Sequence, residues 1–453
     1  MRHFDLAIIG TGSGNSILGP EFDDWDVAIV ERGSFGGTCL NVGCIPTKMF
    51  VYAAEVASTV RHASRYGIDA TVDKIRWTDI RDRVFGRIDP LAAGGERYRT
   101  HDNPNVTVYK GQCRFVGHKR LDTGTGETIT ADRFVIAAGG RPLIPPEVMR
   151  STAAYYTSDT VMRIDELPQR IVILGGGYIA SEFAHVFSAL GVQVSVVARG
   201  SALLRYHDET VSRRFTELAK QRWDVHLGQT PSTVEAVGSE VVLTMPDGTV
   251  VAGDELLVAV GRIPNSDLLD PAATGVVVRS DGRIVVDEYQ RSTVDGILAL
   301  GDISSSYQLK HVANHEARVV RHNLVHPDEP IASDHRFVPS AVFTDPPIAS
   351  VGRTEAHCRL DALDYAVAVQ EYGDVAYGWA LEDTTGFCKI LAERRTGRLL
   401  GAHVMGPQAS TVIQPLIQAL SFGLCADDMA HGQYWIHPAL PEVIENALLA
   451  LDL

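Results

Sequence analysis

The sequence is poor in cysteine and in positive charge. Six cysteines in 453 residues are too few for a disulfide-built scaffold and indicate a reducing compartment. Aspartate and glutamate outnumber lysine and arginine by 56 to 41, which argues against nucleic acid or an anionic membrane as a partner. No apolar run is long enough to span a membrane, and Asp5 and Gly10 interrupt the apolar core that an export signal would need. We therefore expect a cytoplasmic protein with no nucleic-acid or membrane partner.

The length and overall composition are those of a globular protein with several domains. A chain of 453 residues exceeds what one hydrophobic core usually supports, so roughly two to four domains are expected. Hydrophobic residues make up 45% and charged residues 21%, as in ordinary water-soluble proteins. Fibrous and disordered classes are excluded.

Two of the six cysteines, Cys39 and Cys44, stand five positions apart. On a regular helix their Cα atoms would lie about 8 Å apart, beyond the ~7 Å that a disulfide spans. The pair can close only where the backbone is irregular, which Asn41 and Gly43 permit. Pro46 suits a first helical turn, so Cys44 is expected near a helix N-terminus, where the dipole favours a thiolate. The stretch predicts a redox-active dithiol, and two incidental cysteines are the alternative.

A glycine-rich turn precedes the two cysteines. Strand-like residues 6–9 run into a turn with glycines at 10, 12 and 14, and a second apolar strand ends at Glu31. Such glycines let the backbone approach a diphosphate, and an acid about 20 residues later can accept from an adenosine ribose. The turn therefore predicts a dinucleotide site. It is imperfect, because Asn15 replaces the third small residue and Gly19-Pro20 shortens the crossover helix.

A second unit of this kind begins at residue 170. The strand 170–174 is followed by Gly175, Gly177 and Ala180 at the three motif positions, by a helix to residue 190 and by a strand over 192–198. This order predicts a Rossmann-type site. The strand ends at Arg199, with Arg205 following, where a site for NAD would carry an acid. An arginine can accommodate the 2′-phosphate of NADP, although two solvated surface charges are the simpler alternative.

The remaining elements are predicted more coarsely. Helices are expected over 49–65 and 75–98, the second interrupted by turns at Asp89-Pro90 and Gly94-Gly95. Alternating strands followed by helices over 410–422 predict a separate α+β domain from about residue 333. No metal is expected, because no ligand spacing connects the other cysteines, which are Cys113, Cys358, Cys388 and Cys425.

Two dinucleotide units with a Cys-x4-Cys pair between them resemble the FAD- and pyridine-nucleotide-dependent disulfide reductases, the family of glutathione reductase and lipoamide dehydrogenase. The resemblance covers essentially the whole chain. Its markers are residues 36–48, the unit at Gly175, Val260-Gly261-Arg262, Gly301-Asp302, and His437-Pro438 with Glu442. It implies an α/β fold with two Rossmann-like dinucleotide-binding domains and a C-terminal α+β dimerisation domain. The implied divisions are an FAD domain with the redox pair (1–145), an NADPH domain (146–264), a return to the FAD or central region (265–332) and the dimerisation domain with the catalytic histidine (333–453).

The resemblance also implies a path for two electrons, from NADPH to FAD, to the cysteine pair and then to a substrate disulfide. Cys44 would lie against the flavin, and Cys39 would attack the substrate and form a mixed disulfide. Lys48 would stand near flavin N5 with Glu182 as its partner, and Tyr178 would cover the nicotinamide pocket.

The acid/base of this scheme would be His437, oriented by Glu442 and contributed by the second subunit of an obligate homodimer. The resemblance implies further cofactor contacts. Those with FAD would come from Gly10, Gly12, Gly14, Glu31, Gly37, Thr38, Lys48, Gly139 and Asp302. Those with NADPH would come from Gly175, Gly177, Tyr178, Ala180, Arg199, Arg205 and Gly261.

Within the family, four segments are similar to the branch whose substrate is mycothione, the disulfide of the sugar-linked thiol mycothiol: 12–18, 48–55, 309–315 and 432–437. A charge argument supports this branch over glutathione. Between Asn15 and Val30 the chain has no lysine or arginine, and four acids there would repel an anionic disulfide. A cationic disulfide remains compatible with that charge, and the acids are equally explained as solvating a loop.

Two other functions remain open. Lipoamide dehydrogenase is the alternative within the same family, but it carries an acid where Arg199 stands. A flavoprotein subunit with a purely structural role in a complex is the remote alternative, although such a subunit has no need for His437 together with both cysteines.

Overall fold

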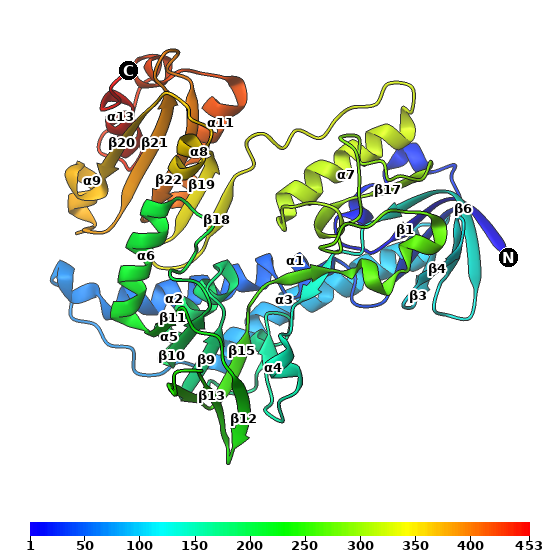
Figure 1. Ribbon diagram of the computed structural model, residues 1–453, viewed down its shortest axis with the longest axis horizontal. Coiled ribbons are helices and arrows are strands. Elements are labelled where there is room, and N and C mark those ends of the chain that lie inside the picture. Colours follow the sequence, from blue (N-terminus) through cyan, green and yellow to red (C-terminus); the bar gives the residue numbers. More distant parts are fainter.

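The computed structural model describes all residues from Met1 to Leu453, and three lobes are visible (Figure 1). Two lobes are built around parallel sheets, and the third, at the C-terminal end, is built around an antiparallel sheet. The predicted mixed α/β class is confirmed. None of the helices combines the length and apolar character needed to cross a lipid bilayer.

The sheet of the first lobe has β1 at its centre. Strands β1 and β2 are buried on both faces over most of their length, which explains why their sequences are continuous apolar runs. A late strand pairs with β6, so the chain returns to this sheet after leaving it. The order is β3 (Val106–Lys110), β2 (Val27–Glu31), β1 (Arg2–Ile9), β6 (Thr128–Ile136), β5 (Arg120–Asp122) and β4 (Arg114–Gly117), with β17 (Ile297–Ala299) also on β6 and α7 (Lys310–Val325) packed on the lobe.

The crossover between β1 and β2 contains no α-helix. It consists of two single 3-10 turns, η1 (Gly14–Ser16) and η2 (Pro20–Phe22). The prediction that Gly19-Pro20 shortens this crossover is confirmed. Because Pro20 follows an extended Gly19, the helix cannot continue through them.

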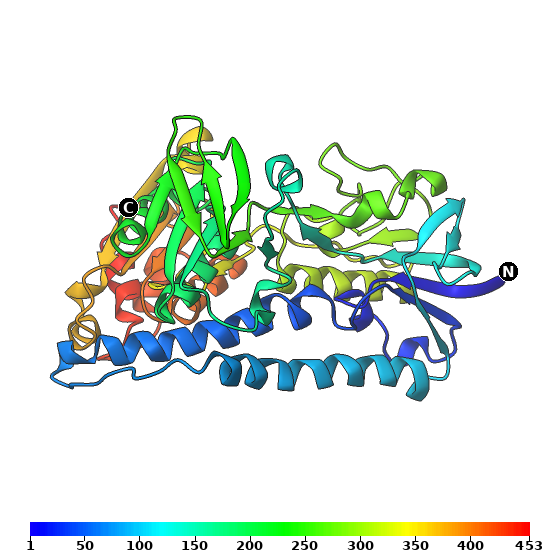
Figure 2. The same cartoon turned by 90° about the horizontal axis from the view of Figure 1, so that it is seen from below.

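Two long helices run side by side beneath the sheets, α2 (Cys44–Arg61) and α3 (Trp77–Arg97) (Figure 2). Phe50 of α2 stacks on Trp77 of α3 with 5.1 Å between ring centroids. Trp77 in turn lies 6.4 Å from Phe187 of α5 (Tyr178–Ala189) in the second lobe. These aromatic contacts make the two helices part of one core with the second lobe.

The turns predicted inside α3 are wrong, because the helix continues through Pro90 and through both glycines. Pro90 is exposed, so its ring disturbs no packed neighbour. The opposite face of α3 buries Val84, Phe85 and Ile88. Burial of this face outweighs the local preference of proline and glycine for a turn.

The second lobe has a parallel sheet with β9 at its centre. Its strand order is β11 (Asp224–Leu227), β10 (Gln193–Ala198), β9 (Arg170–Leu174), β15 (Glu255–Val258) and β8 (Tyr156–Thr157). An antiparallel sheet of β12 (Thr233–Val237), β13 (Glu240–Thr244) and β14 (Val250–Gly253) extends it, together with α6 (Glu209–Arg222) and α4 (Pro146–Met149). The chain enters and leaves this lobe through a two-stranded link, β7 (Gly140–Pro142) with β16 (Arg262–Pro264).

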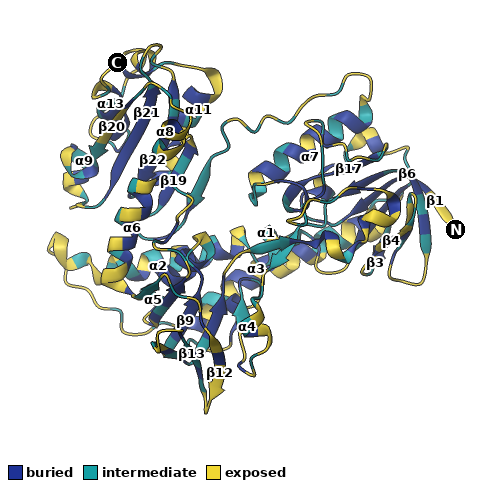
Figure 3. Cartoon of the chain, in the orientation of Figure 1, coloured by how far each residue is buried: buried dark blue, intermediate teal, exposed yellow.

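The third lobe confirms the predicted α+β segment. Its sheet, whose two central strands are buried along their length (Figure 3), runs β18 (Ser340–Val342), β19 (Ile348–Gly352), β22 (Leu399–Met405), β21 (Phe387–Glu393) and β20 (Tyr365–Glu371). The helices predicted over 410–422 are α10 (Ala409–Val412) and α11 (Gln414–Phe422). The other helices of the lobe are α8 (Glu355–Leu360), α9 (Ala376–Ala380), α12 (Ala426–His431) and α13 (Glu442–Leu449). The proposed domain boundaries at 145, 264 and 332 stay predictions.

A buried ion-pair network joins the second and third lobes. Lys389 of β21 is 1% exposed, and its Nζ lies 2.8 Å from Asp208 and 2.6 Å from Glu355. Asp208 also caps α6 by accepting from the Thr210 N–H. Because both carboxylates face one fully enclosed ammonium, this network fixes how the two lobes meet.

Candidate active site

The two cysteines lie on either side of a break between helices. Cys39 is in α1 (Gly37–Asn41), and Cys44 is the first residue of α2. Gly43 forms the break, and a Cβ there would come within 2.9 Å of the Thr38 carbonyl oxygen. The predicted irregularity is confirmed, and it brings the two thiols within hydrogen-bonding reach of each other. The Asn41 amide stabilises the loop before α1 by donating to the Phe35 and Gly37 carbonyl oxygens at 2.8 and 3.0 Å.

Of the two thiols, Cys39 has the lowered pKa and Cys44 the raised one, whereas the sequence predicted that the helix N-terminus would favour the thiolate at Cys44. The pKa of Cys39 is lowered to about 7, first by the hydrogen bond from the Cys44 side chain, then by the charge of Lys310 and the backbone N–H groups of Cys44 and Ile45. The pKa of Cys44 is raised, first because its proton is held in that same bond. The free N–H groups at the start of α2 therefore lower the pKa of the Cys39 thiol.

Lys48 does not form the expected ion pair with Glu182. Its Nζ lies 2.9 Å from Oε1 of Glu55, which is seven residues further along α2, and 4.4 Å from the ring centroid of Phe343. Glu182 accepts instead from the Phe343 N–H at 2.9 Å. Burial raises the pKa of Glu182 to about 7, although this N–H and the nearby Lys48 charge oppose the shift. Lys48 and Glu182 thus share Phe343 as a neighbour without a salt bridge.

Tyr178 opens α5 directly after the glycine turn of the second lobe. Burial of its hydroxyl raises the pKa to about 12, and the charges of Arg262, Asp302 and Cys44 also act on that hydroxyl. The structure therefore brings Tyr178 and Asp302, from different lobes, to the neighbourhood of the cysteine pair. Arg262 links the same region by donating to the Gly140 carbonyl oxygen at 2.7 Å.

The first glycine turn has the shape that a dinucleotide requires. A Cβ on Gly10, which has φ +99°, would lie 2.4 Å from the Ala137 carbonyl oxygen, so no larger residue fits. Gly37, at the start of α1, packs directly against Gly12. The Glu31 carboxylate accepts from the Thr11 N–H and hydroxyl at 2.8 and 2.7 Å. These residues fit FAD, because the turn exposes backbone and Glu31 keeps lone pairs for a ribose.

The glycine turn of the second lobe fits a second dinucleotide. Gly175 has φ +141°, and a Cβ on it would lie 2.2 Å from the Ala259 carbonyl oxygen. A Cβ on Gly177, the N-cap of α5, would meet no atom, so the helix N-terminus is open to a diphosphate. Arg199 and Arg205 are exposed beyond the end of β10, and neither pairs with a carboxylate. Both arginines are free for an additional phosphate.

Three further predicted cofactor contacts, Gly139, Gly261 and Asp302, also lie at turns. Gly139 precedes β7 with φ +63°, and Gly261 precedes β16 with φ +143°. Asp302 lies in a 3-10 turn after β17, and burial raises its pKa. A Cβ on Gly140 would lie 3.7 Å from the Asp302 Cβ, so the turn after β6 and the turn after β17 meet.

His437 and Glu442 form a close pair far from the cysteines of the same chain. His437 Nδ1 lies 2.6 Å from Glu442 Oε1, and the side chains are 71% and 15% exposed. His437 lies in the loop before α13, and Glu442 is the first residue of α13, which packs on β20 and β21, whereas α1 and α2 lie at the opposite side of the third lobe (Figure 1). No hydrogen bond or ion pair joins this loop to Cys39 or Cys44 within one chain.

The acidic run from Glu21 to Asp26 lies away from the cysteines, so the charge argument against glutathione is not supported. Glu21 pairs with Arg321, and Asp26 pairs with Arg2 at 3.0 Å. Asp26 also precedes β2, whose five residues separate it from Glu31 by about 17 Å. These acids solvate the far edge of the first sheet.

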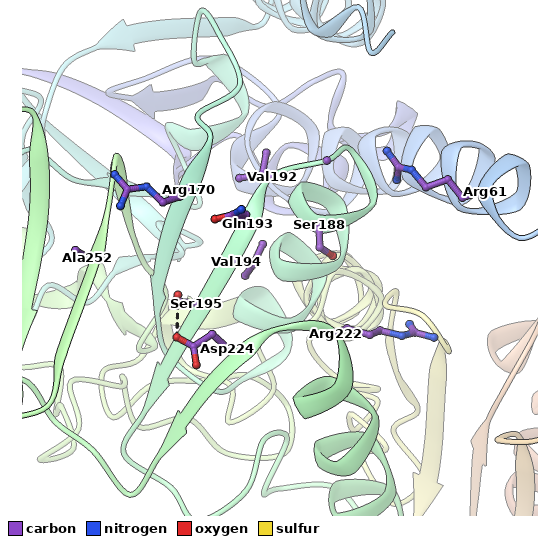
Figure 4. A pocket seen from close by; sticks show the side chains of 11 residues that line it. Arg61, Arg170, Ser188, Val192, Gln193, Val194, Ser195, Arg222, Asp224 and Ala252 are labelled. Atoms are coloured by element: carbon purple, nitrogen blue, oxygen red, sulfur yellow. Dashed lines mark hydrogen bonds between the residues drawn. The ribbon is translucent and has the colours of Figure 1, made fainter. Parts of the chain in front are cut away.

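A cavity of about 650 Å³ in the second lobe also lies away from these residues (Figure 4). It is formed at the N-terminal ends of β9, β10 and β11, whereas the glycine turn of the second lobe follows the C-terminal end of β9. Two arginines that line the cavity already form ion pairs, Arg170 with Asp254 and Arg222 with Asp345. In an open α/β sheet, ligands bind outside the C-terminal ends of the strands, whereas this cavity lies at their N-terminal ends.

Sequence reasoning missed a group of polar residues around the first glycine turn. Lys310 Nζ lies 2.8 Å from Ser13 Oγ, and Ser13 also bonds Asn314 Oδ1 at 3.1 Å. On the other side, Arg99 donates to the Asn15 side chain and carbonyl oxygen. The sequence contains one signal for this group, because segments 12–18 and 309–315 are both similar to the mycothione branch of the family. The sequence does not show, however, that these two segments are in contact.

The family model for pyridine nucleotide-disulphide oxidoreductases matches residues 4–317, and the model for the dimerisation domain of these proteins matches residues 338–448. The chain belongs to this family. It is an oxidoreductase whose cofactors are FAD and NADPH, and it reduces disulfides through its dithiol.

Individual members of the pyridine nucleotide-disulphide oxidoreductase family match over the full length. The chain is 59% identical to mycothione reductase of Mycobacterium tuberculosis, with 100% of both chains covered. It is 32% identical to dihydrolipoyl dehydrogenase of Halobacterium salinarum, covering 98% of this chain and 95% of that protein. Among solved structures, HOCl-induced flavoprotein disulfide reductase RclA from Escherichia coli matches with a TM-score of 0.86 and 27% identity, covering 98% and 99% of the two chains.

Proposed function

We propose that this enzyme is a cytoplasmic homodimer that reduces mycothione to mycothiol with NADPH. The observation that carries the proposal is the 59% identity, over the whole of both chains, to a mycothione reductase. Lipoamide and glutathione relatives are similar at about half that level, 32% in each case. The low cysteine count supports the reducing cytoplasm.

The dithiol performs the disulfide exchange. Cys39 attacks one sulfur of the substrate disulfide, forming a mixed disulfide and releasing the first thiolate, which takes a proton from His437. Cys44, its proton passed to the imidazole, then attacks Cys39 Sγ. The internal disulfide forms, and the second thiolate leaves and is protonated in turn. When bound, FAD and NADPH would supply the two electrons that convert this internal disulfide back to the dithiol.

A second subunit completes the site. His437 is held by Glu442 in an exposed loop and has no cysteine of its own chain beside it. Tyr434 and Ile436 in the same loop are 102% and 76% exposed, which is costly for apolar side chains left in water. A partner that covers them would bring His437 to the other chain's Cys39. The dimerisation-domain match at 338–448 supports this arrangement.

The cofactor residues follow the same proposal. FAD would be held by Gly10, Gly12, Gly14, Glu31, Gly37, Thr38, Lys48, Gly139 and Asp302. NADPH would be held by Gly175, Gly177, Ala180, Gly261, Arg199 and Arg205, with Tyr178 covering the nicotinamide pocket and Glu182 beside it.

A substrate panel tests the proposed function. NADPH oxidation is followed with mycothione, glutathione disulfide, trypanothione disulfide and lipoamide in parallel, and we expect mycothione to give the highest kcat/KM. Cys39→Ser should abolish turnover of every disulfide while NADPH still reduces the flavin. Higher kcat/KM with lipoamide and NADH would make the enzyme a lipoamide dehydrogenase instead.

A further inference from the structure

The glycine turn of the first lobe has lost the helix that normally supports a bound diphosphate. An α-helix N-terminus offers four free N–H groups and about half a positive charge to an anion. Here the turn is followed only by the three residues of η1 and then by Gly19-Pro20. A single 3-10 turn provides much less positive potential, so the FAD diphosphate would lack part of its usual counter-charge.

Lys310 brings a cation to this turn from the far end of the chain. It is the first residue of α7, and its Nζ lies 2.8 Å from Ser13 Oγ. Asn314, one turn further along α7, bonds the same hydroxyl at 3.1 Å and fixes its position. Lys310 forms no ion pair with any carboxylate, so its charge is available at the turn.

Arg99 brings a second cation from the opposite side. It is 8% exposed, and its Nε and Nη2 lie 2.8 and 3.0 Å from the Asn15 side chain and carbonyl oxygen. It also forms no ion pair, and burial lowers the pKa of its guanidinium. An unpaired buried charge is costly. Arg99 also donates to the Asn103 side chain, but no carboxylate neutralises its charge, which is therefore available to an anion bound at the turn.

We propose that Lys310 and Arg99 replace the missing crossover helix as the counter-charge for the FAD diphosphate, acting through Ser13 and Asn15. Two cations, one from α7 and one from the helical turn η4 (Tyr98–Asp102) after α3, converge on Ser13 and Asn15 of one glycine turn, and neither has an acid of its own. The inference concerns cofactor binding and does not depend on which disulfide is reduced.

The test measures FAD affinity without any disulfide substrate. Holoenzyme is diluted, and FAD release is followed by the recovery of flavin fluorescence at increasing sodium chloride. For Lys310→Met we expect FAD to bind roughly tenfold more weakly, with a flatter dependence on salt, because one charge-assisted contact is lost. Lys310→Arg keeps the charge and should stay within about twofold of the wild type. Lys220→Met, which removes an exposed lysine on α6, is the matched control.

Competition of ADP and of adenosine with FAD distinguishes the loss of a charged contact from damage to the whole binding site. ADP carries the diphosphate and adenosine does not, so Lys310→Met should weaken competition by ADP and leave competition by adenosine unchanged. Equal losses for ADP and adenosine would mean that the variant damages the whole site, and the proposal would be overturned. FAD affinity and salt dependence equal to those of the wild type would overturn it too. Arg99→Gln, if it folds with normal circular dichroism, should weaken FAD and ADP in the same way.

Discussion

At the residue scale, the charge on Cys39 decides how fast the dithiol reacts. A thiol with a pKa of about 7 is half ionised at neutral pH, whereas an ordinary cysteine is almost fully protonated there. In the NADPH-reduced enzyme, alkylation of Cys39 by iodoacetamide should therefore accelerate as pH rises through about 7 and slow below it. Cys44→Ser keeps a donor and should change the midpoint little, whereas Cys44→Ala should raise it by removing the hydrogen bond.

The other cysteines provide the control for this measurement. Cys113, Cys358 and Cys388 are buried, whereas Cys44 and Cys425 are at least partly exposed. All five remain in Cys39→Ser, in which the fast phase should vanish. A fast phase that survives in Cys39→Ser, or a midpoint near that of a free thiol, about 8.5, would contradict the assignment of the thiolate to Cys39.

Single residues are also expected to determine the preference for NADPH over NADH. Arg199 and Arg205 are exposed and have no carboxylate partner, although Arg205 donates to the Tyr206 hydroxyl, so each can give a charge-assisted hydrogen bond to a 2′-phosphate. We expect Arg199→Ala with Arg205→Ala to raise the KM for NADPH by roughly tenfold or more and to change the KM for NADH by less than about twofold. Arg213→Ala removes another exposed arginine from the same lobe and should change neither constant. Equal increases for both nucleotides would rule out the phosphate contact.

At the scale of elements, the break between α1 and α2 holds the two thiols together. A Cβ at Gly43 would lie 2.9 Å from the Thr38 carbonyl oxygen, so Gly43→Ala must push α1 away from α2. We expect a loss of about 1–3 kcal/mol in the free energy of unfolding and slower closure of the Cys39–Cys44 disulfide. Urea denaturation and the rate of thiol loss on oxidation measure the two effects.

Gly86 of α3 is the matched control for that substitution. A Cβ there meets no atom within 4 Å, and the residue is inside a helix. Gly86→Ala should therefore stabilise the protein by up to about 1 kcal/mol without changing the dithiol. If both substitutions had the same effect, the steric role of Gly43 would be wrong.

The sequence predicted those elements whose physics is local. Strands such as 170–174 are continuous apolar runs, and the glycines before α5 and α1 are demanded by short-range sterics, so both were recognised. The path of α3 through Pro90 was not recognised, because it depends on a buried face that only the assembled core defines. The partners of Lys48 and Lys310 were equally hidden. Glu55 competes with Glu182 for the same ammonium, and Ser13 lies 297 residues from Lys310.

At the scale of the whole molecule, the proposed active site needs two chains. A variant lacking Cys39 and a variant lacking His437 would each be inactive as homodimers, the second by roughly 10²-fold or more. In a mixed dimer, however, one site would combine the intact Cys39 of one chain with the intact His437 of the other. Random exchange makes half of the dimers mixed, each with one working site of two, so co-refolded Cys39→Ser and His437→Ala should regain about a quarter of wild-type activity.

Differential affinity tags on the two variants allow the mixed dimer to be isolated, and its kcat per dimer should be about half that of the wild type. If instead His437 served the cysteines of its own chain, every site in the mixed dimer would lack one of the two groups. Its activity would then stay at the level of the inactive parents. Restored activity therefore requires the histidine to cross the interface, because no other pairing of the two damaged chains yields a complete site.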